Sequence, residues 1–225
     1  MATVYLDLDG TLLDVSDRYW ALHSDLVRRH GLNAVPPDEF WGMKRRRAPL
    51  PELLGGSDAL RRAYWADWLR LIESSDYLAK DRLLPQAGHM LARLSDGHRL
   101  VLVTMRKHRS SLLAQMARFG IEDLFAKVLC AGQDKQSKAA LIEEDLRAPA
   151  DALVVGDTEV DIEAGRALGI STAAVLTGLR DRERLAAVRP TFLLGSVLDL
   201  PDVLERLLQG DDARLNTARV SRLNP

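Results

Sequence analysis

Short apolar runs alternate with helix-like segments through the second half of this chain. The runs predict strands, and they lie at residues 99–104, 127–130, 152–155, 172–176 and 191–194. The segments between them repeat apolar side chains at the spacing of an amphipathic helix, at residues 87–95, 108–119, 138–146 and 162–168. Nearly continuous apolar strands separated by helices predict a doubly wound parallel sheet that helices cover on both faces.

The first third of the chain has a different pattern. Residues 3–8 predict one strand, and no further strand is predicted before about residue 83. The apolar residues in between follow two helical faces, one that ends at Gly31 and one that begins after Ser57, a predicted N-cap. The side chains on these faces are Val15, Tyr19, Leu22, Leu26, Leu60, Tyr64, Trp68 and Leu71.

These patterns divide the chain into three parts. We expect an α/β core at residues 1–13 and 84–209, an inserted all-α domain at 14–83 and a polar C-terminal tail at 210–225. The insert holds all four tryptophans, large side chains that a small helical bundle needs to fill its core. Trp41 is the one for which we expect a further role, because it lies beside a run of basic residues.

Composition narrows the possible partners. The 225 residues carry a formal net charge of −1, which gives no electrostatic case for binding nucleic acid or an anionic membrane. No apolar stretch reaches the roughly 18 residues of a membrane span. A single cysteine, Cys130, excludes an internal disulfide framework, and the first residues do not resemble a secretory or mitochondrial leader. We therefore expect a cytoplasmic protein without nucleic-acid or membrane partners.

Two acidic clusters follow predicted strands. Asp7 and Asp9 lie at the end of the first strand, and Asp157 and Asp161 follow the strand at 152–155. The carboxyl ends of the strands are the ligand-binding edge of an open α/β sheet. Carboxylates gathered there repel one another, and Mg²⁺, which prefers oxygen ligands, would hold them together. An aspartate at a strand end can also cap the next helix or turn, but this explains one such residue more readily than two clusters.

Four short motifs resemble those of the haloacid dehalogenase (HAD) superfamily in its phosphatase form. Asp7-Leu8-Asp9-Gly10-Thr11 resembles the first motif, and Thr104, at the end of a predicted strand, resembles the second. Lys138 is the best match to the third motif, and Gly156-Asp157 with Asp161 resembles the fourth. The resemblance covers the chain to about residue 209. It implies a Rossmann-like, HAD-type core with an α-helical cap, as in phosphoglycolate phosphatase-like members.

The resemblance also implies chemical roles for these residues. Asp7 would be the nucleophile that forms an aspartyl-phosphate intermediate. Asp9 would be the acid that protonates the leaving oxygen and then the base that activates water. Lys138 and Thr104 would stabilise the negative charge on the phosphoryl group.

A metal site follows from the same resemblance. Mg²⁺ would be held by Asp7, Asp157 and the backbone carbonyl of Asp9. Asp161 would be either a further metal ligand or the carboxylate that orients Lys138. The aspartate at position 9 favours phosphate chemistry over dehalogenation, because a halide leaves without being protonated.

Further substrate contacts are expected near the first two motifs and in the cap. The expected substrate-binding residues are Gly10, Thr11, Met105, Arg106, Arg45 and Arg46. The basic run at 44–47 is either a solvated face or a group that closes over an anionic substrate. The chain departs from the family pattern at Met105, where many relatives have asparagine, and at Ala139, where proline is common. Lys135 is a rival of Lys138 for the third motif.

The function expected from these features is that of a Mg²⁺-dependent phosphatase that hydrolyses a small phosphomonoester metabolite, as a monomer or homodimer. The motifs also allow a phosphomutase of the β-phosphoglucomutase type, which passes the phosphoryl group from Asp7 to a sugar instead of water. A catalytically weak binding or regulatory protein on the same scaffold is a third possibility. The intact Asp7, Asp9, Thr104 and Asp157 argue against it, because loss of such groups is the expected trace of lost catalysis.

Overall fold

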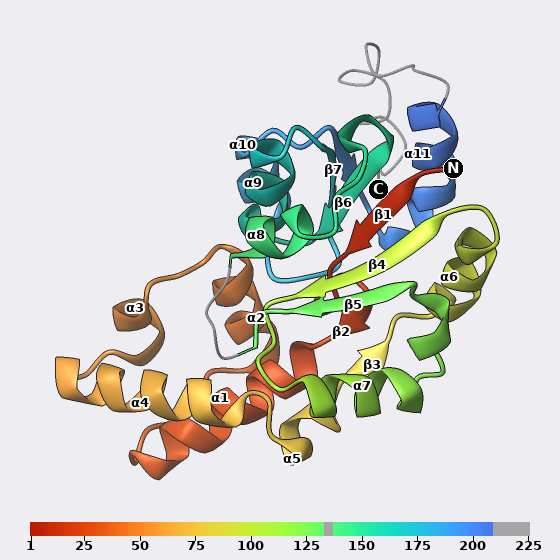
Figure 1. The fold of residues 1–225 in the computed structure, drawn as a ribbon. Helices are drawn as coiled ribbons and strands as arrows, with labels where there is room; N and C mark the ends of the chain where they lie inside the picture. Colours follow the sequence, from red (N-terminus) through yellow and green to blue (C-terminus); the bar gives the residue numbers. More distant parts are fainter. Residues whose placement is uncertain (133–136, 209–225) are drawn as a thin grey trace.

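A parallel sheet of six strands forms the centre of the protein (Figure 1). The computed structural model describes residues 1–132 and 137–208. In spatial order the strands are β5 (Lys127–Cys130), β4 (Arg99–Thr104), β1 (Thr3–Leu6), β6 (Ala152–Gly156), β7 (Ser171–Val175) and β8 (Phe192–Leu194). β1 pairs with β4 on one side and with β6 on the other, so the ends of strands distant in sequence become neighbours.

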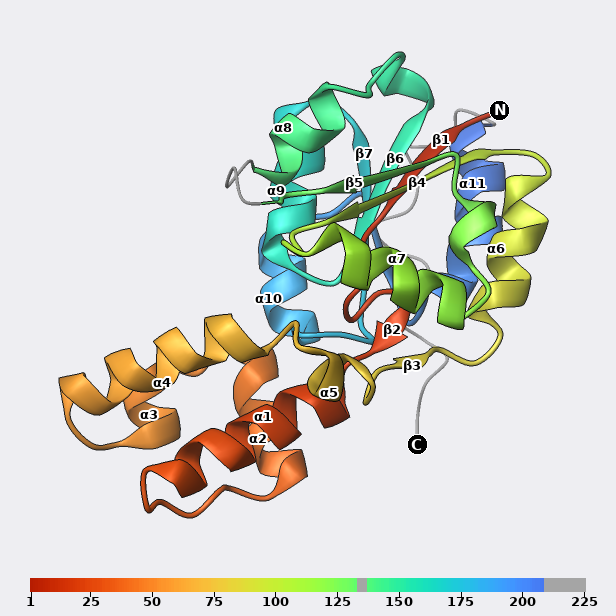
Figure 2. The same cartoon turned by 60° about the horizontal axis from the view of Figure 1, so that its bottom comes forward.

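Helices cover both faces of this sheet, as Figure 2 shows. One face packs against α6 (Ala87–Ser95), α7 (Arg109–Arg118) and α11 (Leu200–Leu208), and the other against α8 (Lys138–Glu143), α9 (Glu159–Ala167) and α10 (Arg182–Ala187). Side chains of a strand alternate between faces, so Val4 and Leu6 of β1 join one apolar cluster and Tyr5 joins the other. Three short 3₁₀ helices are η1 (Glu122–Leu124), η2 (Pro149–Asp151) and η3 (Val197–Asp199).

A helical insertion leaves the core after β1 and returns before α6. Its helices are α1 (Ser16–Arg29), α2 (Pro37–Arg45), α3 (Leu50–Leu54), α4 (Asp58–Leu71) and α5 (Ser75–Leu78). The insertion, called the cap below, begins and ends at two-residue strands, β2 (Leu13–Asp14) and β3 (Arg82–Leu83), which pair antiparallel. It has an apolar cluster of its own that includes Leu22, Phe40 and Trp68. The cap forms the lower lobe in Figure 2.

The structure confirms the predicted α/β fold with a helical insertion. The strands at 99–104 and 127–130 and the helix at 87–95 have the predicted bounds, and Ser57 accepts the N-cap hydrogen bond from Leu60. The first strand ends at Leu6 rather than at residue 8, because the chain turns there toward Gly10. The sequence patterns do not predict the two-residue strands, nor the helices α2, α3, α5, α10 and α11.

Other predictions have mixed outcomes. Trp68 is buried as expected of a cap core, whereas Trp65 is 45% exposed. Cys130 is a half-buried free thiol. The domain boundaries stay a prediction, and the polar tail at 210–225 lies outside the described residues. Within the described ranges, no helix combines the length and the apolar composition needed to cross a membrane.

A buried histidine makes the stability of the cap sensitive to pH. His23 is 1% exposed, stacks on Phe40 at a centroid distance of 4.4 Å, and has its Nδ1 3.1 Å from the Tyr64 hydroxyl. Burial, and then the charge of Lys44, lower the pKa of His23 from 6.5 to about 4. Between these two pH values the unfolded chain takes up a proton that the folded cap refuses, so stability falls as the pH falls.

We predict that wild-type protein loses stability relative to His23→Phe by roughly 1 kcal/mol per pH unit between about pH 6 and pH 4.5. The phenyl ring keeps the stack on Phe40 but cannot take up a proton. Urea unfolding followed by tryptophan fluorescence measures the difference, because Trp68 lies in the same cluster. The exposed His30, changed to Gln, should keep the wild-type pH dependence. A constant difference between wild type and His23→Phe over this range would contradict the assignment.

Candidate active site

Three buried aspartates meet at the carboxyl ends of β1 and β6. Asp7 follows β1, Asp157 follows β6, and Asp161 lies in the first turn of α9. Because β1 and β6 are parallel neighbours in register, the two strand ends lie side by side. Oxygens of the three carboxylates lie within 4.8 Å of one another, and the side chains are at most 10% exposed. Asp7 and Asp157 are 150 positions apart in the sequence. The structure therefore brings together the two acidic clusters that the sequence analysis singled out.

Glycines allow the backbone to approach these carboxylates. A Cβ at Gly178 would lie 2.0 Å from Asp157 Oδ2, and one at Gly156 would lie 2.0 Å from Asp161 Cγ. Gly10 combines a close approach to Asp157 with a φ of 81°, a left-handed conformation that other residues adopt only with strain. The turn after β1 and the loop after β7 thus pack directly against Asp157. A larger residue at Gly10 or Gly178 would push these backbone segments away from it.

Lys138 is the cation of this cluster. It is the first residue of α8, is 4% exposed, and places its Nζ 2.6 Å from Asp7 Oδ1 and 2.5 Å from Asp161 Oδ1. The other oxygen of Asp161 accepts hydrogen bonds from the backbone N–H and the hydroxyl of Thr158, at 3.0 and 2.7 Å. Both oxygens of Asp161 are therefore engaged, an arrangement suited to orienting the lysine. The rival Lys135 lies outside the described residues.

The cluster carries more negative than positive charge. Burial, together with Asp161 and Asp9, raises the pKa of Asp7 to about 7 even though Lys138 opposes the shift. Burial and the charges of Asp7 and Asp161 also raise the pKa of Asp157 well above its ordinary value. A bound cation would reverse both effects, because it favours the ionised carboxylates.

The donor set fits a divalent cation that prefers oxygen. Asp157 Oδ2 accepts the backbone N–H of Leu179 at 2.5 Å, while Asp157 Oδ1 is buried and has no hydrogen-bond partner among the described residues. A buried oxygen without a partner is costly unless a ligand satisfies it. Asp7 and Asp157 offer carboxylate oxygens only, which suits a hard cation such as Mg²⁺ better than a metal that prefers sulfur or imidazole.

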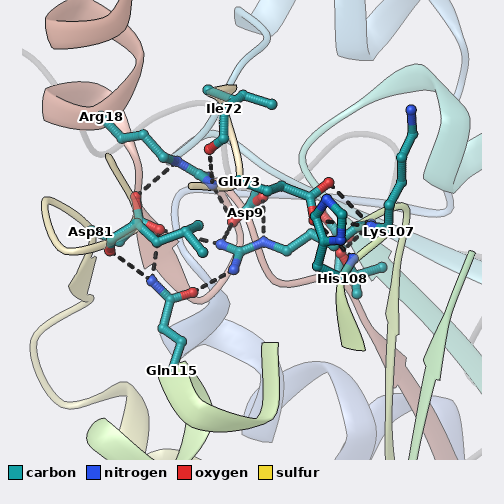
Figure 3. A network of polar contacts seen from close by, with 12 residues as sticks. Asp9, Arg18, Ile72, Glu73, Asp81, Lys107, His108 and Gln115 are labelled. Carbon is teal, nitrogen blue, oxygen red and sulfur yellow. Dashed lines mark hydrogen bonds and ion pairs between the residues drawn. The ribbon is translucent and has the colours of Figure 1, made fainter. Parts of the chain in front are cut away.

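Asp9 belongs to a second network, drawn in Figure 3. Arg106 donates hydrogen bonds from Nε and Nη2 to the two Asp9 oxygens, the first at 3.0 Å. Arg18, on α1 of the cap, has its Nη2 2.9 Å from Asp9 Oδ1 and its Nε 3.0 Å from Asp81. Gln115 of α7 accepts from Arg106 and donates to Asp81 at 2.8 Å. This network joins the cap to the core.

The two guanidinium groups control the charge of Asp9. Burial alone would raise the pKa of Asp9, but the charges of Arg106 and Arg18, with the hydrogen bonds from Arg106, outweigh it and hold this pKa well below its ordinary value. Burial raises the pKa of Asp81 to about 6, with Asp9 adding to the shift and Arg18 opposing it. Asp9 is therefore an ionised carboxylate whose orientation is fixed by the arginines.

A cavity of about 230 Å³ connects the two networks. Its lining consists of Asp7, Asp9, Arg18, Tyr19, Ile72, Glu73, Thr104, Met105, Arg106, Lys138, Asp157, Thr158, Val160 and Leu179. Thr104 is 2% exposed and accepts the backbone N–H of Arg106 at 3.3 Å, while Met105 is 42% exposed at the cavity wall. Six of the residues singled out in the sequence thus line one cavity together with Arg106: Asp7, Asp9, Thr104, Met105, Lys138 and Asp157.

Other expected site residues lie outside the cavity lining. The carbonyl of Gly10 accepts the hydroxyl of Thr177 at 2.7 Å, and Thr11 is fully buried in the same turn. Arg45 donates to the carbonyl of Leu176 at 2.9 Å, and Arg46 pairs with Glu52 on the cap. The expected substrate contacts of Gly10, Thr11, Arg45 and Arg46 therefore stay predictions. In this arrangement Arg45 ties the cap to the core.

The sequence reasoning missed four cavity residues of the cap: Arg18, Tyr19 as a lining residue, Ile72 and Glu73. Arg18 had a signal. It lies three residues after Val15 and four before Leu22, on the apolar face of its helix, where a charge implies a buried partner. Glu73 accepts the backbone N–H groups of Lys107 and His108 at 3.0–3.1 Å, a contact that depends on how the cap sits on the core.

Comparisons with known proteins agree with this arrangement. The family model for haloacid dehalogenase-like hydrolases matches residues 4–175. A phosphoglycolate phosphatase of Synechococcus elongatus is 26% identical, over 93% of this chain and 100% of its own. The pyrophosphatase PpaX of Bacillus pumilus is 27% identical, over 88% of this chain and 94% of its own. A haloacid dehalogenase-like hydrolase of Streptococcus pneumoniae has the same fold, with a TM-score of 0.76 and 20% identity over 90% of this chain and 98% of its own.

We predict that Lys138→Met destabilises the metal-free protein by about 3 kcal/mol at about pH 8, because it leaves Asp7 and Asp161 buried without their cation. The loss should shrink toward about pH 6, where Asp7, with its pKa of about 7, takes up a proton. Urea unfolding in the presence of a chelator measures both values. Lys80→Met, at an exposed position, is the matched control and should change stability little. Equal effects of the two variants would contradict the role given to Lys138.

Proposed function

We propose that this chain, which belongs to the haloacid dehalogenase-like hydrolases and is a phosphatase of small phosphorylated compounds, hydrolyses a small phosphomonoester through an aspartyl-phosphate on Asp7, with Mg²⁺ as cofactor. The observation that carries this proposal is the convergence of Asp7, Lys138 and Asp157 at one end of a cavity that also contains Asp9. We expect the enzyme to act in the cytoplasm.

Asp7 is the proposed nucleophile. An anionic carboxylate attacks a phosphoryl group poorly unless positive charge offsets their repulsion. Lys138 supplies such a charge, with its Nζ 2.6 Å from Asp7 Oδ1, and Thr104 adds a hydroxyl at the cavity wall. The new bond joins an Asp7 oxygen to phosphorus, and the bond from phosphorus to the ester oxygen breaks.

The proposed metal ligands are Asp7, Asp157 and the backbone carbonyl of Asp9. When bound there, Mg²⁺ would neutralise charge on the phosphoryl oxygens. The partnerless buried oxygen of Asp157 supports this position, because no other described group satisfies it. Asp161, with both oxygens engaged by Lys138 and Thr158, is proposed to orient the lysine rather than to bind the metal directly.

Asp9 is the proposed acid and base. It protonates the leaving oxygen in the first step and accepts a proton from the attacking water in the second. The ionised form that Arg106 and Arg18 stabilise is the form needed for the second step. For the first step Asp9 must carry a proton, so its contacts with the arginines must loosen when substrate is bound.

The cap is proposed to select the substrate and exclude water. Glu73 and Arg18 bring cap residues into contact with the core beside the cavity. A cavity of about 230 Å³ is smaller than the pockets typical of drug-sized ligands, which favours a small metabolite. The names of the similar proteins suggest phosphoglycolate or pyrophosphate as first compounds to test. A monomer or a homodimer would both leave this cavity intact.

A phosphomutase remains the second candidate, because the same residues would form the aspartyl-phosphate and pass it to a sugar hydroxyl. The two candidates differ in their products. A phosphatase releases inorganic phosphate, whereas a mutase yields an isomeric sugar phosphate. A binding or regulatory protein on this scaffold would yield neither.

We predict that wild-type protein releases phosphate from a generic aryl phosphate only when Mg²⁺ is present, and that Asp7→Asn abolishes this turnover. Asp9→Asn should lower the rate by about 10² to 10⁴-fold, because it removes general acid–base help. Phosphate release in steady-state assays measures each rate, and Asp14→Asn, outside the cavity, serves as control. Wild-type rates in Asp7→Asn would refute the nucleophile.

We also predict that Mg²⁺ raises the melting temperature of wild-type protein, since a ligand that binds only the folded state stabilises it. At a concentration of about one hundred times its dissociation constant, the gain is about 2.7 kcal/mol. In Asp157→Asn the shift should largely disappear, because the variant loses a ligand and the charge repulsion that the cation relieves. Thermal unfolding with and without Mg²⁺ measures the shift. An unchanged shift in Asp157→Asn would place the metal elsewhere.

A further inference from the structure

Asp9 is surrounded by more positive charge than one carboxylate needs for its orientation. Arg106 alone holds it with hydrogen bonds to both of its oxygens. Arg18 then brings a second guanidinium from the cap, with Nη2 2.9 Å from Asp9 Oδ1 (Figure 3). Burying a second charge costs desolvation free energy, whereas an apolar side chain of similar volume at this position would not carry that cost. Arg18 and Arg106 also pair with Asp81, so two carboxylates balance the two guanidinium groups, and the feature of Arg18 that lacks an explanation is its hydrogen bonding rather than its charge.

Arg18 approaches its carboxylate partners without directed hydrogen bonds. Its Nε lies 3.0 Å from an Asp81 oxygen and its Nη2 lies 2.9 Å from an Asp9 oxygen, yet neither contact has hydrogen-bond geometry. The side chain is only 1% exposed, and it lines the cavity. Its charge is balanced, but these two nitrogens keep hydrogen-bonding capacity for a ligand that enters the cavity.

The two arginines lie at the leaving-group end of the cavity. Asp9 is the proposed acid for the leaving oxygen, and both guanidinium groups contact Asp9. Lys138 and Asp7 lie at the other end of the cavity, called the phosphoryl end. Among the described residues, no side chain forms ion pairs with groups at both ends. A substituent close to the leaving oxygen would therefore meet the arginines and not the lysine.

The chemistry of two guanidinium groups selects an anion at this position. Arginine presents its N–H donors in a planar fork that matches carboxylate and phosphate oxygens, and such charge-assisted pairs are stronger than neutral hydrogen bonds. An anionic group of the substrate could take hydrogen bonds from Arg18 and share Arg106 with Asp9. Because Arg18 comes from the cap and Arg106 from the core, such an anion would also hold the two parts together.

We propose that Arg18 and Arg106 bind a second anionic group of the substrate, a carboxylate or a phosphoryl group carried within a few atoms of the scissile phosphate. This inference rests on the proposed phosphatase function and narrows it to one class of substrate. Simple neutral alkyl phosphates would fit the phosphoryl end but leave the arginine pair without a ligand.

The test compares phosphoglycolate with its neutral amide, which has the same number of non-hydrogen atoms but lacks the second charge. For wild-type enzyme with Mg²⁺ we expect kcat/KM to favour the acid by at least about tenfold. Arg18→Gln should slow both reactions and bring the acid-to-amide ratio close to one. Arg18→Lys, which keeps the charge but not the fork, should give an intermediate ratio. Arg29→Gln, exposed on the same helix, should keep the wild-type ratio.

The ratio separates anion binding from a purely positioning role. If Arg18 only orients Asp9, Arg18→Gln slows both substrates equally and the ratio stays at its wild-type value, which overturns the proposal. Pyrophosphate, as a third substrate, carries a phosphoryl group where phosphoglycolate carries a carboxylate. Of these two substrates, the one whose second anion Arg18 binds should lose more of its kcat/KM in Arg18→Gln.

The wild-type comparison decides the question even if Arg18→Gln does not fold. If wild-type enzyme hydrolyses the amide as fast as the acid, and pyrophosphate no faster than either, the anion subsite is overturned. The proposed phosphatase function would still stand. Absence of phosphate release from every one of these compounds and from an aryl phosphate contradicts the proposed function itself.

Discussion

The repulsion between buried carboxylates is the constraint on which the site depends. Carboxylate oxygens of Asp7, Asp157 and Asp161 lie within 4.8 Å of one another and are almost excluded from water. Without cations their ionised forms would drive the strand ends apart. Lys138 balances part of this charge from α8, and the remaining excess creates the demand for a divalent metal. Once a metal is bound, its charge and that of Lys138 would attract the phosphoryl group, so the electrostatics of folding and of phosphate chemistry have one origin.

The cap completes the second half of the site. Arg18 reaches from α1 to Asp9 and Asp81, and Glu73 accepts backbone N–H groups at the start of α7. These contacts exist only when the cap rests on the core, because each joins a cap residue to a core residue or to the segment that leads back into it. The position of the cap and the environment of the proposed acid are therefore set by the same interactions. A cap that moved away would expose Asp9 to water and leave it with Arg106 alone.

The sequence predicts those parts of the fold and site that depend on local pattern. Apolar runs predict β4 and β5 with their observed bounds. Asp7 and Asp157 each follow a predicted strand, and this position alone indicates the acidic edge of the sheet without knowledge of the strand order. Arg18 and Glu73 were not identified, because their partners lie on elements distant in sequence and are reached only when the cap docks. The pairing of β2 with β3 was missed for a related reason, since two-residue strands carry no periodicity and form only because the two cap linkers run side by side.

The division of the cavity into two ends suggests how one scaffold can serve different substrates. The phosphoryl end, with Asp7, Lys138 and the proposed metal, contacts features that every phosphomonoester shares, so it cannot distinguish one ester from another. Discrimination must then come from the groups that face the leaving portion, and in this chain these are Arg106 of the core and residues of the cap. Substitutions in the cap can change that end without disturbing the buried carboxylates, because the two ends are joined by separate ion pairs. Residues that select the substrate can therefore change while the residues of the phosphoryl end keep their contacts.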